Sequence, residues 1–210
     1  GGGNNSTFTC RTLTSADTDA YSAYSAAIGS LKGQRHGGAN FKVIRQLEEF
    51  KENISDWEND GQVADYIAKV IRKEAGDGSG LVYGMGHAVY TLSDPRAVIL
   101  KRNAVKLAQG TEYEKEFRLL DAVERLTPEV FANVKGSTKT MCANVDLYSG
   151  LVYRMLKIPV ELNTPLFAVS RISGWAAHRI EELINGRRII RPAYKAVAKR
   201  KKYIPLGERV

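Results

Sequence analysis

The sequence predicts an all-α fold. Helix start and stop signals recur along the 210 residues, apolar residues repeat at helical spacing, and the strict alternation typical of β-strands is almost absent. Since 43% of the residues are hydrophobic, the chain can build one ordinary domain, or one compact domain and part of another.

These signals predict seven helices. Their approximate ranges are 16–32, 38–51, 61–75, 94–110, 113–125, 145–157 and 164–185. Loops rich in glycine or polar residues are expected at 77–80, 84–86 and 135–139. Pro159 ends the sixth helix, because proline cannot continue the helical hydrogen bonding.

The fourth and seventh helices have the clearest boundaries. Asp94 supplies an N-cap carboxylate before Pro95 at the first helical position, and Gly110 supplies the stop. Thr164-Pro165 begins the seventh helix in the same way, and Asn185-Gly186 ends it. The apolar residues at helical spacing are Val98, Ile99, Val105 and Leu107 in the fourth helix, and Phe167, Val169, Ile172, Ala176, Ile180, Leu183 and Ile184 in the seventh.

The composition argues against several classes of protein. Cys10 and Cys142 lack paired metal-ligand spacing, so neither a metal site nor a disulfide framework is expected, and a reducing cytoplasm is the default location. The most hydrophobic stretch, 166–184, is interrupted by charged residues, so no membrane span is expected. The start at Gly1 shows no secretory signal and indicates a fragment that begins inside a longer chain.

The net charge of +8 belongs to one segment near the C-terminus. Eight of the 31 Lys and Arg lie within 187–202, where no acid occurs, and the remaining 23 equal the 23 Asp and Glu in number. Three interpretations stay open for this basic segment: a solvated tail, a subsite for an anionic small molecule, or a contact patch for a phosphate backbone. No nucleic-acid-binding motif accompanies it, so a nucleic-acid partner is not expected.

Two histidines lie in glycine-rich turns. Around His36 the sequence reads Gly-Gln-Arg-His-Gly-Gly-Ala-Asn, where one helix stops and the next begins. Glycine lets backbone approach a ligand, and a histidine at a helix N-terminus tends to stay neutral. The alternative is a tight turn in which His36 only caps or packs. His87 follows Gly84-Met85-Gly86, which leaves backbone groups accessible.

Arg96 and Asp146 lie at helix starts. A cation in the first turn is unfavourable beside the helix dipole, so Arg96 is either screened by solvent or binds an anion. Asp146 begins an apolar helix, and taken alone it is an ordinary first-turn or N-cap acid.

Taken together and in this order, the motifs resemble those of citrate synthases. They are His-Gly-Gly-Ala-Asn from His36, Gly-x-Gly-His-x-Val-Tyr through His87, Asp-Pro-Arg from Asp94, Asn-Val-Asp-x-Tyr-Ser-Gly from Asn144, Val-Ser-Arg ending at Arg171 before Gly-Trp, and Ile-Ile-Arg-Pro from Ile189. The resemblance extends from residue 1 to about residue 194 and covers the C-terminal half of such an enzyme. In the family a substrate-binding histidine lies directly before the position of Gly1, so we expect the 210 residues alone to be inactive.

The resemblance implies a multi-helical fold in which a small helical domain, 37–157, is inserted in a larger helical domain formed by 1–36 and 158–210. It implies an acyltransferase of the tricarboxylic acid cycle that condenses oxaloacetate with acetyl-CoA through an enol or enolate to citryl-CoA, which is hydrolysed to citrate and CoA. Acetyl-CoA or propionyl-CoA is a co-substrate, no metal or permanently bound cofactor is implied, and the enzyme is expected to be a homodimer.

The resemblance also implies roles for single residues. Asp146 matches the base that removes the α-proton of the acyl group, and His36 matches the neutral imidazole that donates a hydrogen bond to the thioester oxygen. His87 matches the residue that binds the oxaloacetate carbonyl and delivers a proton to it. A carboxylate with an ordinary pKa near 3.9 is a weak base, so desolvation and enolate stabilisation are expected to carry the catalysis. The residues that match the clamp on substrate carboxylates are Arg96, Arg171 and, from the partner subunit, Arg191.

The co-substrate site is matched only in part. The residues that match the loop whose backbone recognises adenine are Val82, Tyr83, Gly84, Met85 and Gly86. Some family members carry a basic residue after the His87 motif that contacts CoA phosphates, whereas here 90–93 reads Tyr-Thr-Leu-Ser. Phosphate contacts are therefore expected from elsewhere, and the basic segment is one candidate.

Three alternatives stay open. A 2-methylcitrate synthase that uses propionyl-CoA differs only in pocket volume, since one methylene is worth about 1–3 kcal/mol. A citryl-CoA lyase is less favoured, because Asp94-Pro95-Arg96 and Tyr148-Ser149-Gly150 look more like the synthase. The third alternative belongs to another class of protein. It is a catalytically inactive regulatory or scaffold module, which is considered because the chain covers half of the usual length.

Overall fold

The computed structural model describes residues 3–87, 89–137, 140–186, 188–193, 195 and 197–209. Within these residues the chain forms eight α-helices and two single-turn 3-10 helices, and the only β-type pairing is one isolated bridge between Met85 and Ala143. The predicted all-α fold is confirmed. The helices are α1 (Asn5–Thr14), α2 (Ala20–Leu31), α3 (Ala39–Asn53), α4 (Asp60–Arg72), α5 (Pro95–Ala108), α6 (Glu114–Lys135), α7 (Asp146–Met155), η1 (Val160–Leu162), α8 (Asn163–Asn185) and η2 (Leu206–Glu208).

The seven expected helices are present as α2 to α8, with boundaries that differ by a few residues in most cases. Helix α1 was not predicted; it is rich in serine and threonine, is capped by the Asn4 side chain, and packs against α2 and α8. Helix α6 is longer than predicted, because Pro128 lies inside this helix and does not stop it.

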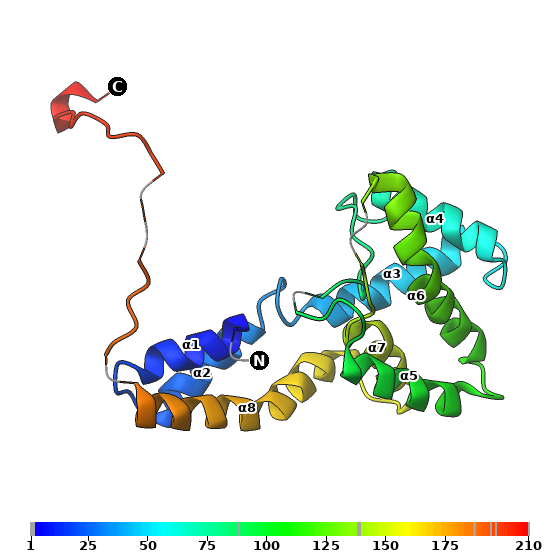
Figure 1. The fold of residues 1–210 in the computed structure, drawn as a ribbon, viewed down its shortest axis with the longest axis horizontal. Coiled ribbons are helices and arrows are strands. Elements are labelled where there is room, and N and C mark those ends of the chain that lie inside the picture. The colour runs from blue at the N-terminus through cyan, green and yellow to red at the C-terminus, as the bar shows by residue number, and fades with distance from the viewer. Residues whose placement is uncertain are drawn as a thin grey trace.

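Buried side chains form two separate clusters, one in each lobe of the molecule (Figure 1). The larger cluster joins α3 to α7 and includes Phe50, Ile67 and Tyr148. The smaller cluster joins α1, α2 and α8 around Trp175, which is fully buried. Helix α8 contacts α3 of the larger lobe and also α1 and α2 of the smaller one, so it connects the two lobes (Figure 1). The domain boundaries at 36/37 and 157/158 stay a prediction.

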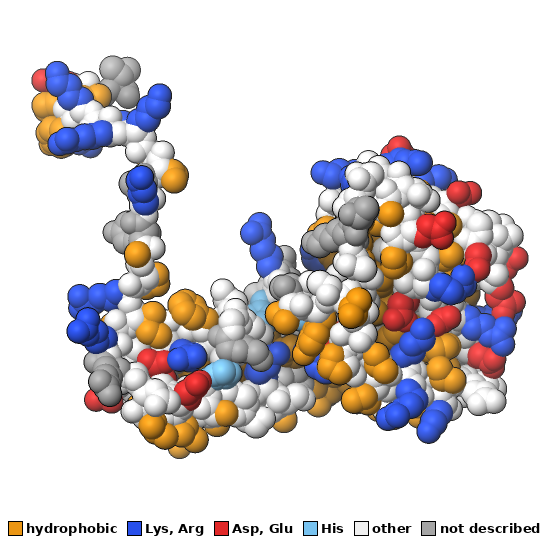
Figure 2. All heavy atoms as spheres, in the orientation of Figure 1, with side chains coloured by type: hydrophobic (Ala, Val, Ile, Leu, Met, Phe, Trp, Pro, Cys, Tyr) orange, Lys and Arg blue, Asp and Glu red, His pale blue; other side chains and the backbone are white. Residues whose placement is uncertain are grey.

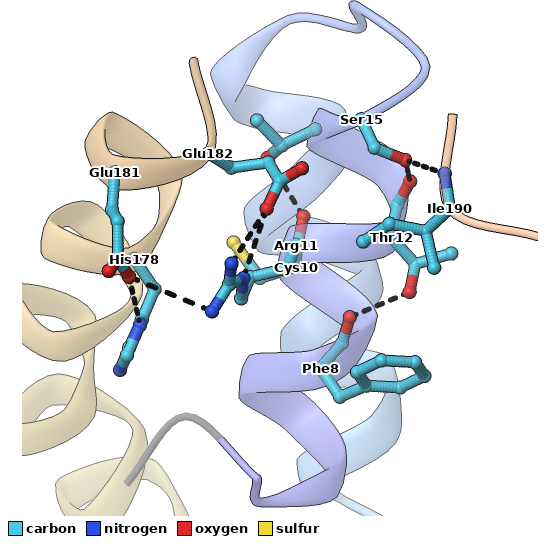
Figure 3. Close-up of polar contacts among 10 residues, drawn as sticks. Phe8, Cys10, Arg11, Thr12, Ser15, His178, Glu181, Glu182 and Ile190 are labelled. Carbon is cyan, nitrogen blue, oxygen red and sulfur yellow. Dashed lines mark hydrogen bonds and ion pairs between the residues drawn. The ribbon is translucent and has the colours of Figure 1, made fainter. Parts of the chain in front are cut away.

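Helix α1 is held on α8 by an ion pair (Figure 3). Arg11 donates from Nε and Nη2 to Glu182 Oε2 at 3.1 and 2.9 Å, and its Nη1 lies 3.6 Å from Glu181 Oε2. Ser15 at the end of α1 accepts a hydrogen bond from Ile190 N at 3.0 Å. This contact tethers the beginning of the C-terminal segment to the smaller cluster of helices.

The apolar stripes of α5 and α8 are largely exposed, although stripes of this kind usually face a core. The exposed members are Val98, Ile99, Val105 and Leu107 on α5, and Val169, Ile172, Ile180, Leu183 and Ile184 on α8. On α5 the buried residues are instead alanines, Ala97, Ala104 and Ala108. Hydrophobic side chains lie along the lower edge of the space-filling view, where Figure 1 places α8 (Figure 2). Contiguous apolar surface is typical of an interaction site.

The C-terminal segment, described at 188–193, 195 and 197–209, extends away from both lobes (Figure 1) and carries several of the blue Lys and Arg side chains in Figure 2. Its described residues are exposed, apart from the partly buried Ile190. Arg187 of the basic segment and Lys139 of the predicted 135–139 loop lie outside the described residues. In the described part of the chain, no helix is long and apolar enough to cross a membrane.

Candidate active site

A polar cavity of about 770 Å³ lies between residues of the two lobes. Cavities of a few hundred to a thousand Å³ are typical of small-molecule sites. Its lining includes five of the six predicted catalytic and clamp residues, namely His36, His87, Arg96, Asp146 and Arg171. The sixth, Arg191, is exposed on the C-terminal segment and is not among the lining residues. The fold thus brings together side chains that are up to 135 positions apart in the sequence.

Asp146 is the first residue of α7 and is partly buried. Burial raises the pKa of its carboxyl to about 6, with a further upward contribution from Asp94 and an opposing one from Arg96. The pKa of Asp146 therefore lies above the ordinary value near 3.9. At neutral pH Asp146 is still mostly ionised, and it is a stronger base than a solvated aspartate.

His36 lies in the turn before α3, with its Nε2 3.0 Å from Ser6 Oγ on α1. Burial lowers the pKa of His36, and the positive charge of Arg171 lowers it further, so the neutral form predicted from the sequence is favoured. Ser6 is fully buried, and its hydroxyl donates to Asn4 Oδ1 at 2.8 Å. Because a hydroxyl has one proton, Ser6 Oγ then accepts from His36 Nε2, and donation from His36 Nδ1 to a substrate requires the Ser6 hydroxyl to turn toward Nε2.

The His36 turn is tightly packed against α8. A Cβ on Gly37 would collide with the carbonyl oxygen of Leu31 and would lie 2.8 Å from Thr164 Cγ2, so only glycine fits this position. Thr164 Oγ1 donates to Gly37 O at 3.0 Å. The predicted N-cap role of Thr164 is wrong, because α8 begins at Asn163 and the Thr164 hydroxyl binds the turn instead.

Three buried polar side chains join helices next to this turn. Asn40 on α3 donates from Nδ2 to Ser149 Oγ on α7 at 2.5 Å and accepts from Asn163 Nδ2 on α8 at 2.7 Å. All three residues line the cavity. Buried hydrogen bonds of this kind fix the relative placement of the helices that carry His36, Asp146 and Arg171.

His87 is oriented by backbone groups of its own loop. Its Nδ1 accepts from Val89 N at 2.9 Å and from Tyr90 N at 3.0 Å, which assigns the ring proton of the neutral form to Nε2. Arg96 Nη2 lies 3.3 Å from this Nε2. Both groups are then donors, and they converge on a position that suits an oxygen acceptor such as a carbonyl or carboxylate.

Arg96 is held in place by Asp94, whose carboxylate is only 1% exposed. Arg96 donates from Nε to Oδ1 at 3.0 Å and from Nη2 to Oδ2 at 2.7 Å. Burial pushes the pKa of Asp94 upward, but the hydrogen bonds from Arg96 outweigh it, so the net pKa lies below the usual value. Arg96 is therefore tolerated in the first turn of α5, because the N-cap carboxylate of Asp94 compensates its charge.

Arg171 on α8 has an unsatisfied donor. Its Nη1 is buried and has no hydrogen-bond partner among the described residues, while its guanidinium lies 4.9 Å from the centre of the Phe167 ring. Burial lowers the pKa of Arg171, and repulsion from Arg96 lowers it further. A buried guanidinium without a counter-ion is costly, so the cavity is electrostatically prepared for an anion.

A second cavity, of about 370 Å³, adjoins the predicted adenine loop. Its charged lining residues are three cations, Lys32, Lys42 and Arg45, and two acids, Glu49 and Asp77. Arg45 Nε lies 3.6 Å from Glu49 Oε1. None of these cations was assigned a role from the sequence. No described residue of the basic C-terminal segment lines either cavity.

Tyr83 fixes one end of the loop from Val82 to Gly86. Gln46 accepts from Tyr83 N at 3.0 Å and donates to Tyr83 O at 3.2 Å, so both backbone groups of this residue are occupied. Lys42 Nζ donates to Tyr83 Oη at 3.0 Å, and Tyr83 Oη donates to Asp77 at 2.6 Å. Adenine recognition by the Tyr83 N–H would require Gln46 to move away, whereas Tyr83 O can accept a second hydrogen bond. Val82, Gly84 and Met85 are buried.

Residues 1–193 match the family described as "Citrate synthase, C-terminal domain". The chain belongs to the citrate synthase family. Among the described residues, no group of three or more His, Cys, Asp or Glu is arranged to hold a metal ion.

Relatives in the family include citrate synthases and 2-methylcitrate synthases. The chain is 38% identical over 208 residues to a citrate synthase of Synechocystis sp., covering 99% of this chain and 48% of the relative. It is 40% identical to citrate synthase 2 of Bacillus subtilis, covering 98% and 50%. It is 37% identical to a 2-methylcitrate synthase of Shewanella oneidensis, again covering 98% and 50%. The chain thus spans about half the length of the curated relatives it matches.

Solved structures of the family share the fold. The citrate synthase of Thermotoga maritima superposes with a TM-score of 0.77 at 34% identity, covering 98% of this chain and 52% of that one. A citrate synthase from Thermoplasma acidophilum, in a ternary complex with carboxymethyl coenzyme A and oxaloacetate, gives 0.73 at 34% identity and covers 98% and 51%.

Proposed function

We propose that this chain carries the catalytic cavity of a citrate synthase, which condenses oxaloacetate with acetyl-CoA and hydrolyses the resulting citryl-CoA. The observation that carries the proposal is the pair of guanidinium groups, Arg96 and Arg171, in one cavity with Asp146 and two histidines. Arg171 has a buried donor without a partner, and the two cations repel each other. A dicarboxylate such as oxaloacetate satisfies both requirements.

The donors around His87 fit the carbonyl of the keto acid. With the carboxylates of oxaloacetate on Arg96 and Arg171, its carbonyl oxygen would accept from His87 Nε2. This hydrogen bond polarises the carbonyl and makes its carbon electrophilic. His87 then has two functions, to bind the ground state and to supply a proton as negative charge develops on the oxygen.

Asp146 and His36 would act on the acyl-CoA. The Asp146 carboxylate takes a proton from the α-carbon, and the electrons of that C–H bond move into the thioester, whose oxygen accepts a hydrogen bond from His36. The enol or enolate carbon then forms the new C–C bond with the oxaloacetate carbonyl carbon, and the carbonyl oxygen takes the His87 proton. Water cleaves the thioester of citryl-CoA and releases citrate and CoA. Each acid–base group contributes on the order of 10²- to 10⁴-fold.

The second cavity suits the phosphates of the co-substrate. Lys32, Lys42 and Arg45 place three positive charges beside the adenine loop, and phosphates bind at such clusters. We therefore propose Lys32, Lys42 and Arg45, rather than the basic C-terminal segment, as the main phosphate contacts.

Loss of two of these cations is expected to weaken binding of the acyl-CoA alone. A Lys42→Gln, Arg45→Gln double variant should raise KM for the acyl-CoA roughly 10-fold or more, with kcat and KM for oxaloacetate little changed, because uniform binding is removed. An Arg118→Gln variant is the control, since Arg118 forms exposed ion pairs with Glu58 and Glu114 on the same lobe. Equal KM values for the double variant and the wild type would contradict the assignment.

The active form is proposed to be a homodimer in a reducing cytoplasm, where the buried free thiols Cys10 and Cys142 would persist. Two observations support a dimer: the exposed apolar stripe of α8, and the position of Arg191 on a segment that leaves its own lobes. We propose that Arg191 completes the carboxylate clamp of the partner subunit.

A 2-methylcitrate synthase is the second candidate, because a relative of that name is nearly as similar to this chain as the citrate synthases are. The test uses the complete enzyme. This means the present chain together with the other half of a citrate synthase, which the alignments with the relatives do not cover. Release of free CoA thiol is measured with acetyl-CoA and with propionyl-CoA, each with and without oxaloacetate. We expect oxaloacetate-dependent release with a higher kcat/KM for acetyl-CoA. A higher value for propionyl-CoA would favour the second candidate, and no release with either would contradict both.

A further inference from the structure

The side chain of Asn144 joins the loop that carries His87 to the helix that carries Asp146. Its Oδ1 accepts a hydrogen bond from Asp146 N at 3.0 Å, and its Nδ2 donates to Gly86 O at 3.0 Å. Its own backbone N donates to Gly84 O at 2.9 Å. One residue thus contacts the backbone of Asp146 and the backbone of the residue before His87.

Among the described residues, Asn144 is the one whose side chain accepts a hydrogen bond from the backbone N–H of Asp146 at the N-terminus of helix α7. Its N-cap position, Val145, forms no capping hydrogen bond, so the Asn144 amide is the acceptor for the backbone N–H of Asp146. The remaining links between the two segments are the bond from Gly86 N to Cys142 O, at 2.7 Å, the bond from Cys142 Sγ to Tyr90 O, at 3.4 Å, and the bridge between Met85 and Ala143. These links reach the His87 loop from Cys142 and Ala143, whereas Asn144 also bonds the backbone of Asp146 itself.

The His87 loop lies directly against α7 because of a glycine. Gly84 has a φ of 85°, and a Cβ at this position would lie 2.9 Å from Leu147 Cα and 2.7 Å from Leu147 Cδ1. The close approach brings the carbonyls of Gly84 and Gly86 within hydrogen-bonding distance of Asn144. Two side chains therefore bond across these segments: the Asn144 amide, which contacts the backbone of both Gly86 and Asp146, and Cys142, whose Sγ contacts Tyr90 O.

We propose that Asn144 is a positioning residue, which sets the separation and orientation of His87 and Asp146 by bonding the backbone beside each of them. The inference rests on the proposed function, because it assumes that these two side chains act in one reaction. Misplacement of reacting groups by about 1 Å can cost on the order of 10²-fold in rate. Binding of the substrate carboxylates and phosphates depends mainly on the arginines and lysines of the two cavities, and His87 adds a single hydrogen bond to the oxaloacetate carbonyl. The effect should therefore appear in kcat rather than in KM.

The first test is Asn144→Ala in the complete enzyme, which removes both side-chain bonds. We expect kcat to fall about 10- to 10²-fold, with KM for oxaloacetate and for acetyl-CoA within about threefold of wild type. The matched control is Asn59→Ala. Asn59 caps α4 in the same lobe by accepting from Gly61 N at 3.0 Å and Gln62 N at 3.2 Å, and it lines neither cavity. This control should lose a similar amount of thermal stability and keep its kcat.

Asn144→Asp separates the two hydrogen bonds. It keeps an acceptor for Asp146 N, and it loses the donor to Gly86 O. It also adds a negative charge two residues from Asp146, whose carboxyl already responds to Arg96 and Asp94 and lies near the Tyr153 phenol and His87. A second carboxylate favours the protonated form of Asp146. We expect a lower kcat and an acid limb of the kcat–pH profile that moves to higher pH, which a purely structural defect would not produce.

Several outcomes would overturn the inference. A folded Asn144→Ala enzyme with wild-type kcat, or with a raised KM alone, would show that Asn144 does not position the reacting groups. If Asn144→Ala does not fold, Asn144→Asp carries the test, and an unchanged kcat and pH profile would overturn the inference. A wild-type enzyme that condenses neither acyl-CoA would overturn the proposed function and this inference together, whereas an active wild type with a normal Asn144→Ala variant would overturn this inference alone.

Discussion

An Asp146→Asn variant of the complete enzyme is expected to lose at least about 10²-fold in kcat while it keeps its fold. Asparagine is nearly isosteric with aspartate but cannot take the α-proton of the acyl group. The measurement is oxaloacetate-dependent thiol release under saturating substrates. Near-normal turnover would remove Asp146 from the role of base.

The pKa of Asp146 supplies the control and a second readout. Because burial raises this pKa to about 6, the native state binds more protons than the unfolded chain between about pH 4 and pH 6, and stability falls as pH rises through that window. At neutral pH the buried, ionised carboxylate lowers the free energy of unfolding by up to about 3 kcal/mol. The neutral asparagine side chain avoids this loss. The variant should therefore melt at the same temperature as wild type or higher. For the wild type, kcat should fall as pH drops below about 6, since the base becomes protonated.

Mixing two inactive proteins is expected to restore activity if Arg191 serves the partner subunit. Asp146→Asn and Arg191→Ala enzymes are each poorly active, but a hybrid dimer contains one doubly defective site and one intact site. Random reassortment makes about half of the dimers hybrid, so about a quarter of all sites are native. The two proteins are unfolded and refolded together, and the rate is compared with each refolded alone.

Recovery towards about one quarter of the refolded wild-type rate supports a site shared across the dimer. If mixing restores nothing while wild type refolds well, Arg191 serves its own subunit or belongs to a solvated tail. The position of Arg191 on an exposed segment, outside the cavity that holds Arg96 and Arg171, is what makes a partner's site the expected destination.

The ends of helices could be predicted more readily than the surfaces they bury. Asp94 caps α5 and α8 ends at Asn185, because such signals act through hydrogen bonds within a few residues. The apolar stripes of both helices are largely exposed, since burial depends on surfaces that the local pattern does not specify. Helix α1 escaped prediction for the related reason that packing against α2 and α8, not apolar periodicity, supports it.

The candidate site shows the same division. His36, His87 and Asp146 lie in glycine- or asparagine-containing motifs that can be recognised along the chain. The hydrogen-bond partners of the site residues could not be predicted, because they lie far away in the sequence. Ser6 is 30 positions from His36, and Gln46 is 37 positions from Tyr83. Contacts between distant segments depend on the fold. The Asp94–Arg96 pair is the exception, since it spans two residues and a carboxylate beside an arginine could have suggested it.

The most direct test of the proposed site is a crystal structure of the complete enzyme with oxaloacetate and carboxymethyl coenzyme A, the ligands of the Thermoplasma acidophilum complex. We predict oxaloacetate carboxylates on Arg96 and Arg171, its carbonyl oxygen within hydrogen-bonding distance of His87 Nε2, and the carboxymethyl group between Asp146 and His36. Oxaloacetate bound elsewhere, or a carboxymethyl group remote from Asp146, would contradict the assignment of this cavity as the place where the two substrates react.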